Sequence, residues 1–213
     1  MLITKRLKEI KKNISSNLSL VVVSKTRSNE EILEIYKSGQ LVFGENKIQE
    51  LTKKHKELPK NIKWHMIGHL QTNKVKYIAG FISLIHSVDS IKLLCEINKR
   101  AFNEKRIITC LIQIKIASEK EKYGFEINEL DEALKISEKL KNIKIIGLMG
   151  MATFTSNNNL INGEFNKLNQ IFKQYKSDDF NTLSMGMSND YRIAIKNGST
   201  MIRLGSSIFG DRT

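Results

Sequence analysis

Short apolar runs alternate with helical patterns along the whole chain. Each run is rich in Val, Ile and Leu, and it is followed by a polar or glycine-containing turn and then by apolar residues spaced three or four apart. Segment 161–175 shows the helical spacing most clearly. The apolar runs lie at 18–25, 41–43, 63–68, 82–89, 107–118, 143–153, 180–188 and 199–205. The pattern predicts eight strand–helix units in series.

Helix starts follow several of these runs directly. Ser28 and Glu31 have the spacing of a capping box, and Gly39 is placed to end the helix that they begin. After the fourth run, Asp89 is expected to cap a helix over 91–98. Loops between the elements are therefore short.

Strand–helix repeats with short loops predict parallel strands joined by crossover helices. Uninterrupted apolar strands fit a sheet that is covered on both faces. Eight units predict an α/β fold that closes into a single (β/α)8 TIM barrel, with a doubly wound open sheet as the alternative. No GxGxxG motif follows the first strand, and no Gly/Ser-rich linker interrupts the chain. We expect one domain over 1–213.

Composition places the chain among ordinary globular proteins. Of its 213 residues, 40% are apolar and 27% charged, and no long uncharged apolar run is present. The first residues alternate charged and apolar positions too closely for a signal peptide. We therefore expect a cytoplasmic protein. Cys95 and Cys110 are expected to be reduced, mostly buried thiols, and the four histidines show no metal-binding spacing.

The formal net charge of +13 raises the question of nucleic-acid binding. The excess comes from lysines that are scattered along the chain, and no aromatic stacking motif accompanies them. This dispersed charge resembles compositional bias more than a binding stripe, so nucleic acid is discounted as a partner.

Polar residues and glycines collect where the predicted strands end, and a barrel of this type carries its active site at that end. Gly186 and Ser188 follow the seventh strand, and Gly205 and Ser206 follow the eighth. Backbone N–H groups and serine hydroxyls in such loops can hold a phosphate. Together the two segments predict a phosphate cradle, although Ser188 could equally be a plain helix cap.

Two positively charged side chains lie inside or next to predicted apolar strands. Arg203 needs a partner, either a carboxylate or a ring nitrogen of a ligand. Burial would lower the pKa of Lys25 and make its free amine available. Near a phosphate cradle, such an amine suits an imine with the aldehyde of pyridoxal 5′-phosphate (PLP). A salt bridge from Lys25 to Glu45 is an equally weighted alternative.

Six motifs, in order along the chain, resemble those of the pyridoxal phosphate homeostasis proteins, which are relatives of the N-terminal barrel of alanine racemase. The motifs are VSKT, FGENKIQE, WHMIGHLQTNK, GLMGMA, LSMGMSND and GSTMIRLGSSIFG. The set spans nearly the whole chain and is much more specific than any single motif.

The resemblance implies a (β/α)8 barrel that holds PLP as an imine (Schiff base) on Lys25. It implies that Arg203 faces the pyridine nitrogen and that Asn46 lies near the cofactor. It also implies phosphate contacts from residues of the last two loops. These are Ser184, Ser188, Thr200, Gly205 and Ser206.

The resemblance further implies a monomeric PLP carrier that regulates PLP and amino and keto acids without catalytic turnover, and PLP-requiring apoenzymes as its partners. A permanent cation at Arg203 disfavours protonation of the ring nitrogen, which weakens carbanion chemistry. A low-activity PLP-dependent amino-acid racemase is the alternative. It would need a base opposite Lys25, for which His69 and Tyr123 are the candidates.

Overall fold

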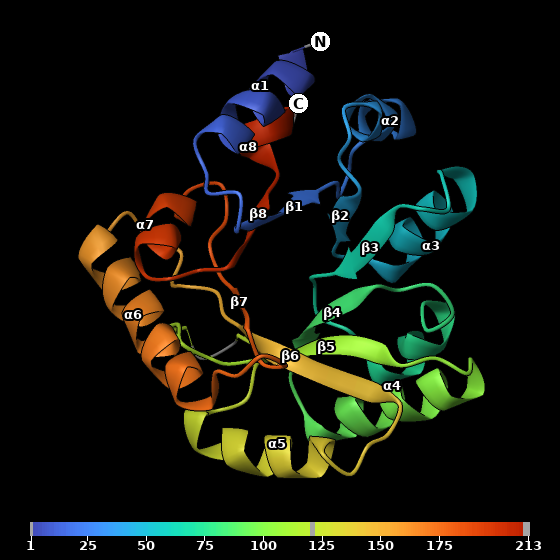
Figure 1. The fold of residues 1–213 in the computed structure, drawn as a ribbon, viewed down its shortest axis with the longest axis vertical. Coiled ribbons are helices and arrows are strands. Elements are labelled where there is room, and N and C mark those ends of the chain that lie inside the picture. Colours follow the sequence, from blue (N-terminus) through green and yellow to red (C-terminus); the bar gives the residue numbers. More distant parts are fainter. Residues whose placement is uncertain (1, 120–121, 211–213) are drawn as a thin grey trace.

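In the computed structural model, which describes residues 2–119 and 122–210, the chain forms a closed barrel of eight parallel strands surrounded by helices (Figure 1). The strands follow one another in chain order, and the last pairs with the first. They are β1 Ser19–Val23, β2 Val42–Glu45, β3 Lys63–Met66, β4 Leu84–Val88, β5 Ile108–Gln113, β6 Ile143–Met149, β7 Thr182–Ser184 and β8 Met201–Leu204. The predicted (β/α)8 barrel is confirmed, and the open sheet is wrong.

Helices form a ring outside the strands (Figure 1). The α-helices are α1 Leu2–Lys12, α2 Asn29–Lys37, α3 Ile48–Glu57, α4 Ile91–Asn103, α5 Leu130–Ser137, α6 Asn158–Tyr175, α7 Tyr191–Lys196 and α8 Ser206–Phe209. Two short 3-10 helices, η1 Thr72–Tyr77 and η2 Ile127–Glu129, complete the set in the described part of the chain. The segment after β3, expected to be helical, is thus only a 3-10 helix.

The barrel separates two apolar layers because successive side chains of a strand point to opposite faces. The larger layer lies between strands and helices and includes Trp64 and Phe43. The smaller layer comes from the other strand faces; its buried members are Val21, Leu84, Leu111, Met149 and Met201. His86 and Arg203 each follow one of these residues by two positions, so the same face turns polar towards the carboxyl ends of the strands.

One predicted helix cap is confirmed and one is wrong, and the expected burial of one cysteine is wrong as well. The capping box of Ser28 and Glu31 is confirmed, but α4 is capped by Ser90, whose Oγ accepts from the N–H of Leu93, and not by Asp89. Cys95 is exposed on α4, contrary to expectation, whereas Cys110 is buried, and both are free thiols.

One helix lies outside the predicted pattern. Helix α1 buries Leu7 and Ile10 and packs against α2 and α8, so the beginning and the end of the described chain lie side by side (Figure 1). Its many lysines and short apolar stripe hide the helical period in the sequence.

Candidate functional site

Because all eight strands are parallel, their carboxyl ends meet at one end of the barrel, here called the rim. Lys25 lies two residues beyond β1 and is half-buried, and Asn46 directly follows β2. Ser184 is the last residue of β7, and Arg203 is the third of four residues in β8. The rim therefore gathers four of the predicted site residues from distant parts of the chain.

Arg203 is 3% exposed, and its hydrogen bonds go to neutral oxygens. Nη1 donates to Ser184 Oγ at 2.6 Å, and Nη2 donates to the carbonyl oxygen of Gly150 at 3.2 Å. Burial lowers the pKa of Arg203 to about 10, and the Asp190 carboxylate opposes this shift. The guanidinium is still a cation at neutral pH, and it is held in place by groups that do not neutralise it.

Two histidines extend this arrangement across the barrel. His86 Nδ1 lies 3.0 Å from Ser184 Oγ, and His86 Nε2 lies 3.0 Å from His65 Nδ1. A hydrogen-bonded chain thus runs from β3 through β4 and β7 to Arg203 on β8. Sequence reasoning missed this chain. The only signal was the spacing of two residues between Leu84 and His86, which puts both on one strand face.

Acid should weaken the fold through these histidines. Burial lowers the pKa of His65 to about 3 and that of His86 well below 6.5. Below about pH 6.5 the unfolded chain binds protons on both side chains while the folded protein does not. The free energy of unfolding should therefore fall as the pH drops from about 6.5 towards 3, by about 1.4 kcal/mol per pH unit for each histidine.

Denaturant titrations of the wild-type protein and of His65→Phe at several pH values check this expectation. The slope of the free energy of unfolding with pH should be smaller in the variant than in the wild-type protein, by about 1.4 kcal/mol per pH unit. Equal slopes for the two proteins would show that His65 does not stay neutral in the folded state.

The loops after β7 and β8 meet through Ser188. Its Oγ accepts hydrogen bonds from the backbone N–H groups of Gly205, at 3.2 Å, and Ser207, at 3.3 Å. Ser188 therefore does not cap α7; the cap residue is Asp190. Gly186 makes the turn possible, because its φ is +96° and a Cβ there would lie 2.6 Å from Ala194 Cβ. Two amide N–H groups thus converge on one oxygen at the rim.

The remaining predicted phosphate residues lie differently. Ser206 is exposed at the start of α8, beside the two amides. Ser184 is fully buried, and its hydroxyl is hydrogen-bonded to Arg203 and His86. Thr200 precedes β8, and its Oγ1 accepts from the N–H of Leu183 at 2.7 Å. The structure therefore brings Ser206 to the rim but leaves Thr200 at the opposite end of β8.

Asn46 offers an unusual acceptor. Its Oδ1 is buried and has no hydrogen-bond partner among residues 2–119 and 122–210. The chain packs closely here, since a Cβ on Gly68 would lie 2.5 Å from the carbonyl oxygen of Asn46. A buried acceptor without a partner is costly in a folded protein, and at a binding site it marks a place for a donor from a ligand or water. Next to it, Glu45 pairs with Lys54 at 2.8 Å.

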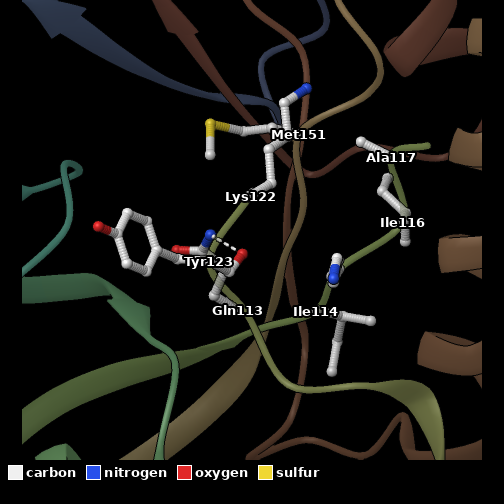
Figure 2. A pocket seen from close by; sticks show the side chains of 8 residues that line it. Gln113, Ile114, Ile116, Ala117, Lys122, Tyr123 and Met151 are labelled. Atoms are coloured by element: carbon white, nitrogen blue, oxygen red, sulfur yellow. Dashed lines mark hydrogen bonds between the residues drawn. The ribbon is translucent and has the colours of Figure 1, made fainter. Parts of the chain in front are cut away.

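A narrow pocket lies beyond the ends of β5 and β6 (Figure 2). It is lined by Gln113, Ile114, Lys115, Ile116, Ala117, Lys122, Tyr123 and Met151. Gln113 Nε2 donates to the carbonyl oxygen of Tyr123 at 2.7 Å, which fixes the loop that carries this tyrosine.

The two candidate bases lie together beside this pocket. The rings of His69 and Tyr123 stack with centroids 3.6 Å apart, and His69 Nδ1 lies 2.8 Å from Asp89 Oδ2. The carboxylate that was expected to cap α4 therefore orients His69 instead.

Two other kinds of site find no support in residues 2–119 and 122–210. No helix there is long and apolar enough to cross a membrane. No group of three His, Cys, Asp or Glu side chains in the same residues could hold a metal ion.

Comparison with known proteins agrees with this geometry. Residues 2–213 match the family described as alanine racemase, N-terminal domain. A protein of Aquifex aeolicus named pyridoxal phosphate homeostasis protein is 39% identical over 198 residues, which cover 91% of this chain and 86% of the relative.

Solved structures show the same likeness over the full chain. PipY of Synechococcus elongatus without PLP superimposes with a TM-score of 0.93 at 30% identity, covering 98% of this chain and all of that one. The same protein with PLP bound gives a TM-score of 0.89. Alanine racemase from Bartonella henselae, at 15% identity and a TM-score of 0.76, shares the barrel fold over 58% of its chain. The chain belongs to the pyridoxal phosphate homeostasis protein family, within the alanine racemase N-terminal domain family.

Proposed function

We propose that this protein binds PLP at the rim, as an imine on Lys25, and serves the homeostasis of PLP and of amino and keto acids without turning over a substrate of its own. The observation that carries the proposal is the meeting of three groups at one end of the barrel. They are the Lys25 amine, the buried Arg203 cation and the converging amides of Gly205 and Ser207. The PLP named for PipY supports it.

The residues at the rim fit the parts of PLP. The amide N–H groups of Gly205 and Ser207 converge on Ser188 Oγ, and a phosphate oxygen would take the place of that oxygen. The hydroxyls of Ser188 and Ser206 could then donate to the phosphate. Arg203 can only donate, so it suits the lone pair of an unprotonated ring nitrogen. The unpartnered Oδ1 of Asn46 is available to a donor.

When bound, PLP supplies an electrophilic aldehyde and an electron-withdrawing ring. The Lys25 side-chain nitrogen would hold the cofactor at its aldehyde carbon, with the aldehyde oxygen leaving as water. The hydrogen bonds from Arg203 to Ser184 Oγ and to the carbonyl oxygen of Gly150 fix the orientation of the guanidinium. The neutral His86 in turn contacts Ser184 Oγ through Nδ1.

The absence of turnover is supported by the charge at Arg203. A cation facing the ring nitrogen disfavours its protonation and so weakens the ring as an electron sink. The pyridoxal phosphate homeostasis protein of Aquifex aeolicus is matched over 86% of its length, whereas the alanine racemase of Bartonella henselae is matched over only 58% of its length. We also place the protein in the cytoplasm, as a monomer with one domain over 1–213 that delivers PLP to apoenzymes.

A PLP titration of the purified protein, followed by borohydride, tests this function. The visible absorption of a protonated imine should appear at one equivalent, and reduction should add one pyridoxyl mass. A protein that gives neither would contradict the proposal.

The pair of Asp89 and His69, stacked on Tyr123, favours one second candidate, a weak racemase. Incubation of the PLP-loaded protein with alanine in deuterated water separates the two functions. We expect exchange of the α-hydrogen far below one per second, whereas about one per second or faster would indicate an enzyme.

A further inference from the structure

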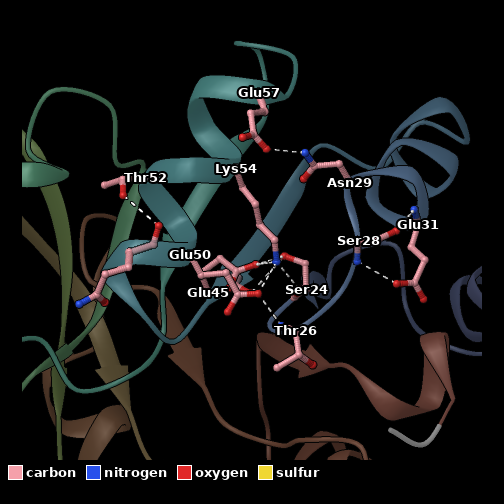
Figure 3. Close-up of polar contacts among 12 residues, drawn as sticks. Ser24, Thr26, Ser28, Asn29, Glu31, Glu45, Glu50, Thr52, Lys54 and Glu57 are labelled. Carbon is pink, nitrogen blue, oxygen red and sulfur yellow. Dashed lines mark hydrogen bonds and ion pairs between the residues drawn. The ribbon is translucent and has the colours of Figure 1, made fainter. Parts of the chain in front are cut away.

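Lys54 of α3 reaches through the outer layer to the segment that carries Lys25 (Figure 3). Its Nζ donates to three oxygens: the backbone oxygen of Ser24 at 2.6 Å, Glu50 Oε1 at 2.7 Å and Glu45 Oε1 at 2.8 Å. An ammonium group has three donors, so these contacts use all of them.

The two carboxylates bind the same segment. Glu50 Oε1 accepts from the backbone N–H of Thr26 at 2.5 Å, and Glu45 Oε1 accepts from Ser24 Oγ at 2.6 Å (Figure 3). We call Glu45, Glu50 and Lys54 the α3 clamp.

The clamp holds both peptide groups that flank Lys25. The Ser24 carbonyl belongs to the peptide before the Cα of Lys25, and the Thr26 N–H belongs to the peptide after it. With both planes fixed, the backbone angles of Lys25 are set, and so is the direction in which its side chain leaves the backbone.

The backbone beside Lys25 is also strained. Thr26 has a φ of +64°, in the left-handed region that β-branched residues rarely adopt. Such a conformation persists only where surrounding contacts determine it. The bond from Thr26 N–H to Glu50 is one of these contacts.

Stability alone does not account for the α3 clamp, because burying charged groups has a large desolvation cost. Glu45 is fully buried and Lys54 is 5% exposed, and buried ion pairs often stabilise no more than apolar side chains of similar size. Desolvation raises the pKa of Glu45, and the nearby Lys54 ammonium opposes this rise. A role in fixing one local geometry accounts for keeping the pair.

We propose that Glu45, Glu50 and Lys54 are positioning residues that fix the backbone on both sides of Lys25 and so aim its amine at the aldehyde of PLP. This inference rests on the proposed function for its chemical consequence. Its structural part, the fixed backbone around Lys25, can be measured without the cofactor.

Glu50→Ala tests the clamp with little risk to folding, because the Glu50 side chain is 24% exposed. In the ligand-free protein, hydrogen exchange at the Thr26 amide should quicken about tenfold or more, since a bond to a charged acceptor is lost. With PLP, imine formation should slow by about 10- to 100-fold because the amine is misplaced. Affinity for pyridoxine 5′-phosphate, which lacks the aldehyde, should change by less than about threefold. A change of that size is what a substitution away from the binding contacts usually causes.

Two further variants complete the test. Glu50→Gln keeps an acceptor for the Thr26 N–H and should restore most of the imine rate. The double variant Glu45→Met with Lys54→Met removes the buried charges together, should fold, and should slow imine formation as Glu50→Ala does. Lys144→Met, which breaks an exposed pair with Asp179 at the start of β6, should leave both readouts unchanged.

The outcomes separate the two proposals. A wild-type protein that forms no imine would contradict the proposed function. Unchanged Thr26 exchange and unchanged imine rate in folded Glu50→Ala and in the folded double variant would overturn the positioning role. Equal losses of imine rate and pyridoxine 5′-phosphate affinity would overturn it too, because they would indicate general damage to the site.

Discussion

We expect a Lys25→Ala variant to give no visible imine absorption with PLP and to take up no pyridoxyl group on borohydride reduction. The reason is that an imine needs a primary amine, and Lys25 is the lysine that lies two residues beyond β1, at the rim. Binding of PLP through the phosphate loops should persist with lower affinity. Absorption spectra and intact mass before and after reduction measure both effects.

Lys115→Ala is the matched control for this experiment. Lys115 lines the narrow pocket beyond β5 and β6, and its Nζ pairs with Glu126 Oε1 at 3.2 Å. The control should keep the absorption band in full. A folded Lys25→Ala protein that still gave a reducible band would place the imine on another lysine.

The phosphate should account for most of the affinity of the cofactor. Hydrogen bonds to a charged group contribute about 1.5–3 kcal/mol each, so two amide donors correspond to a factor of about 100 or more. Pyridoxal, which lacks the phosphate, should therefore bind at least about 100-fold more weakly than PLP. Competition titrations against PLP give this ratio directly.

Ser188→Ala and Thr200→Ala locate the phosphate contact. Ser188→Ala should reduce the ratio of PLP affinity to pyridoxal affinity, because a phosphate held by the amides of Gly205 and Ser207 would lose the Ser188 hydroxyl as a donor. Thr200→Ala should leave the ratio unchanged, since its hydroxyl bonds to Leu183 N–H at the other end of β8. The reverse order would put the phosphate away from the rim.

The barrel was predictable because its signal is periodic. Eight apolar runs, each followed by a helical pattern, leave few arrangements other than parallel strands closed on themselves. The positions of Lys25, Asn46 and Arg203 at or near the rim were predictable too, because the end of a strand can be located from the sequence without knowing which residues pack beside it. Helix α1 was not predicted from the hydrophobic pattern, because its buried residues are only Leu7 and Ile10 in a segment rich in lysine.

Side-chain contacts between strands could not be predicted from the sequence. The hydrogen-bonded chain from His65 through His86 and Ser184 to Arg203 depends on which residues share a face and a height in four strands. Ser188 and Thr200 illustrate the same limit: both are hydroxyl residues in loops beside β7 and β8, yet they lie at opposite ends of β8. A motif identifies the residue types, but only the register of the strands says where each side chain lies.

The most direct test of the account is peptide mapping of the protein after PLP loading and borohydride reduction. If Lys25 holds PLP, mapping should find one pyridoxyl group, on Lys25, in the peptide that joins β1 to α2. A pyridoxyl group on any other lysine, or on none, would contradict it.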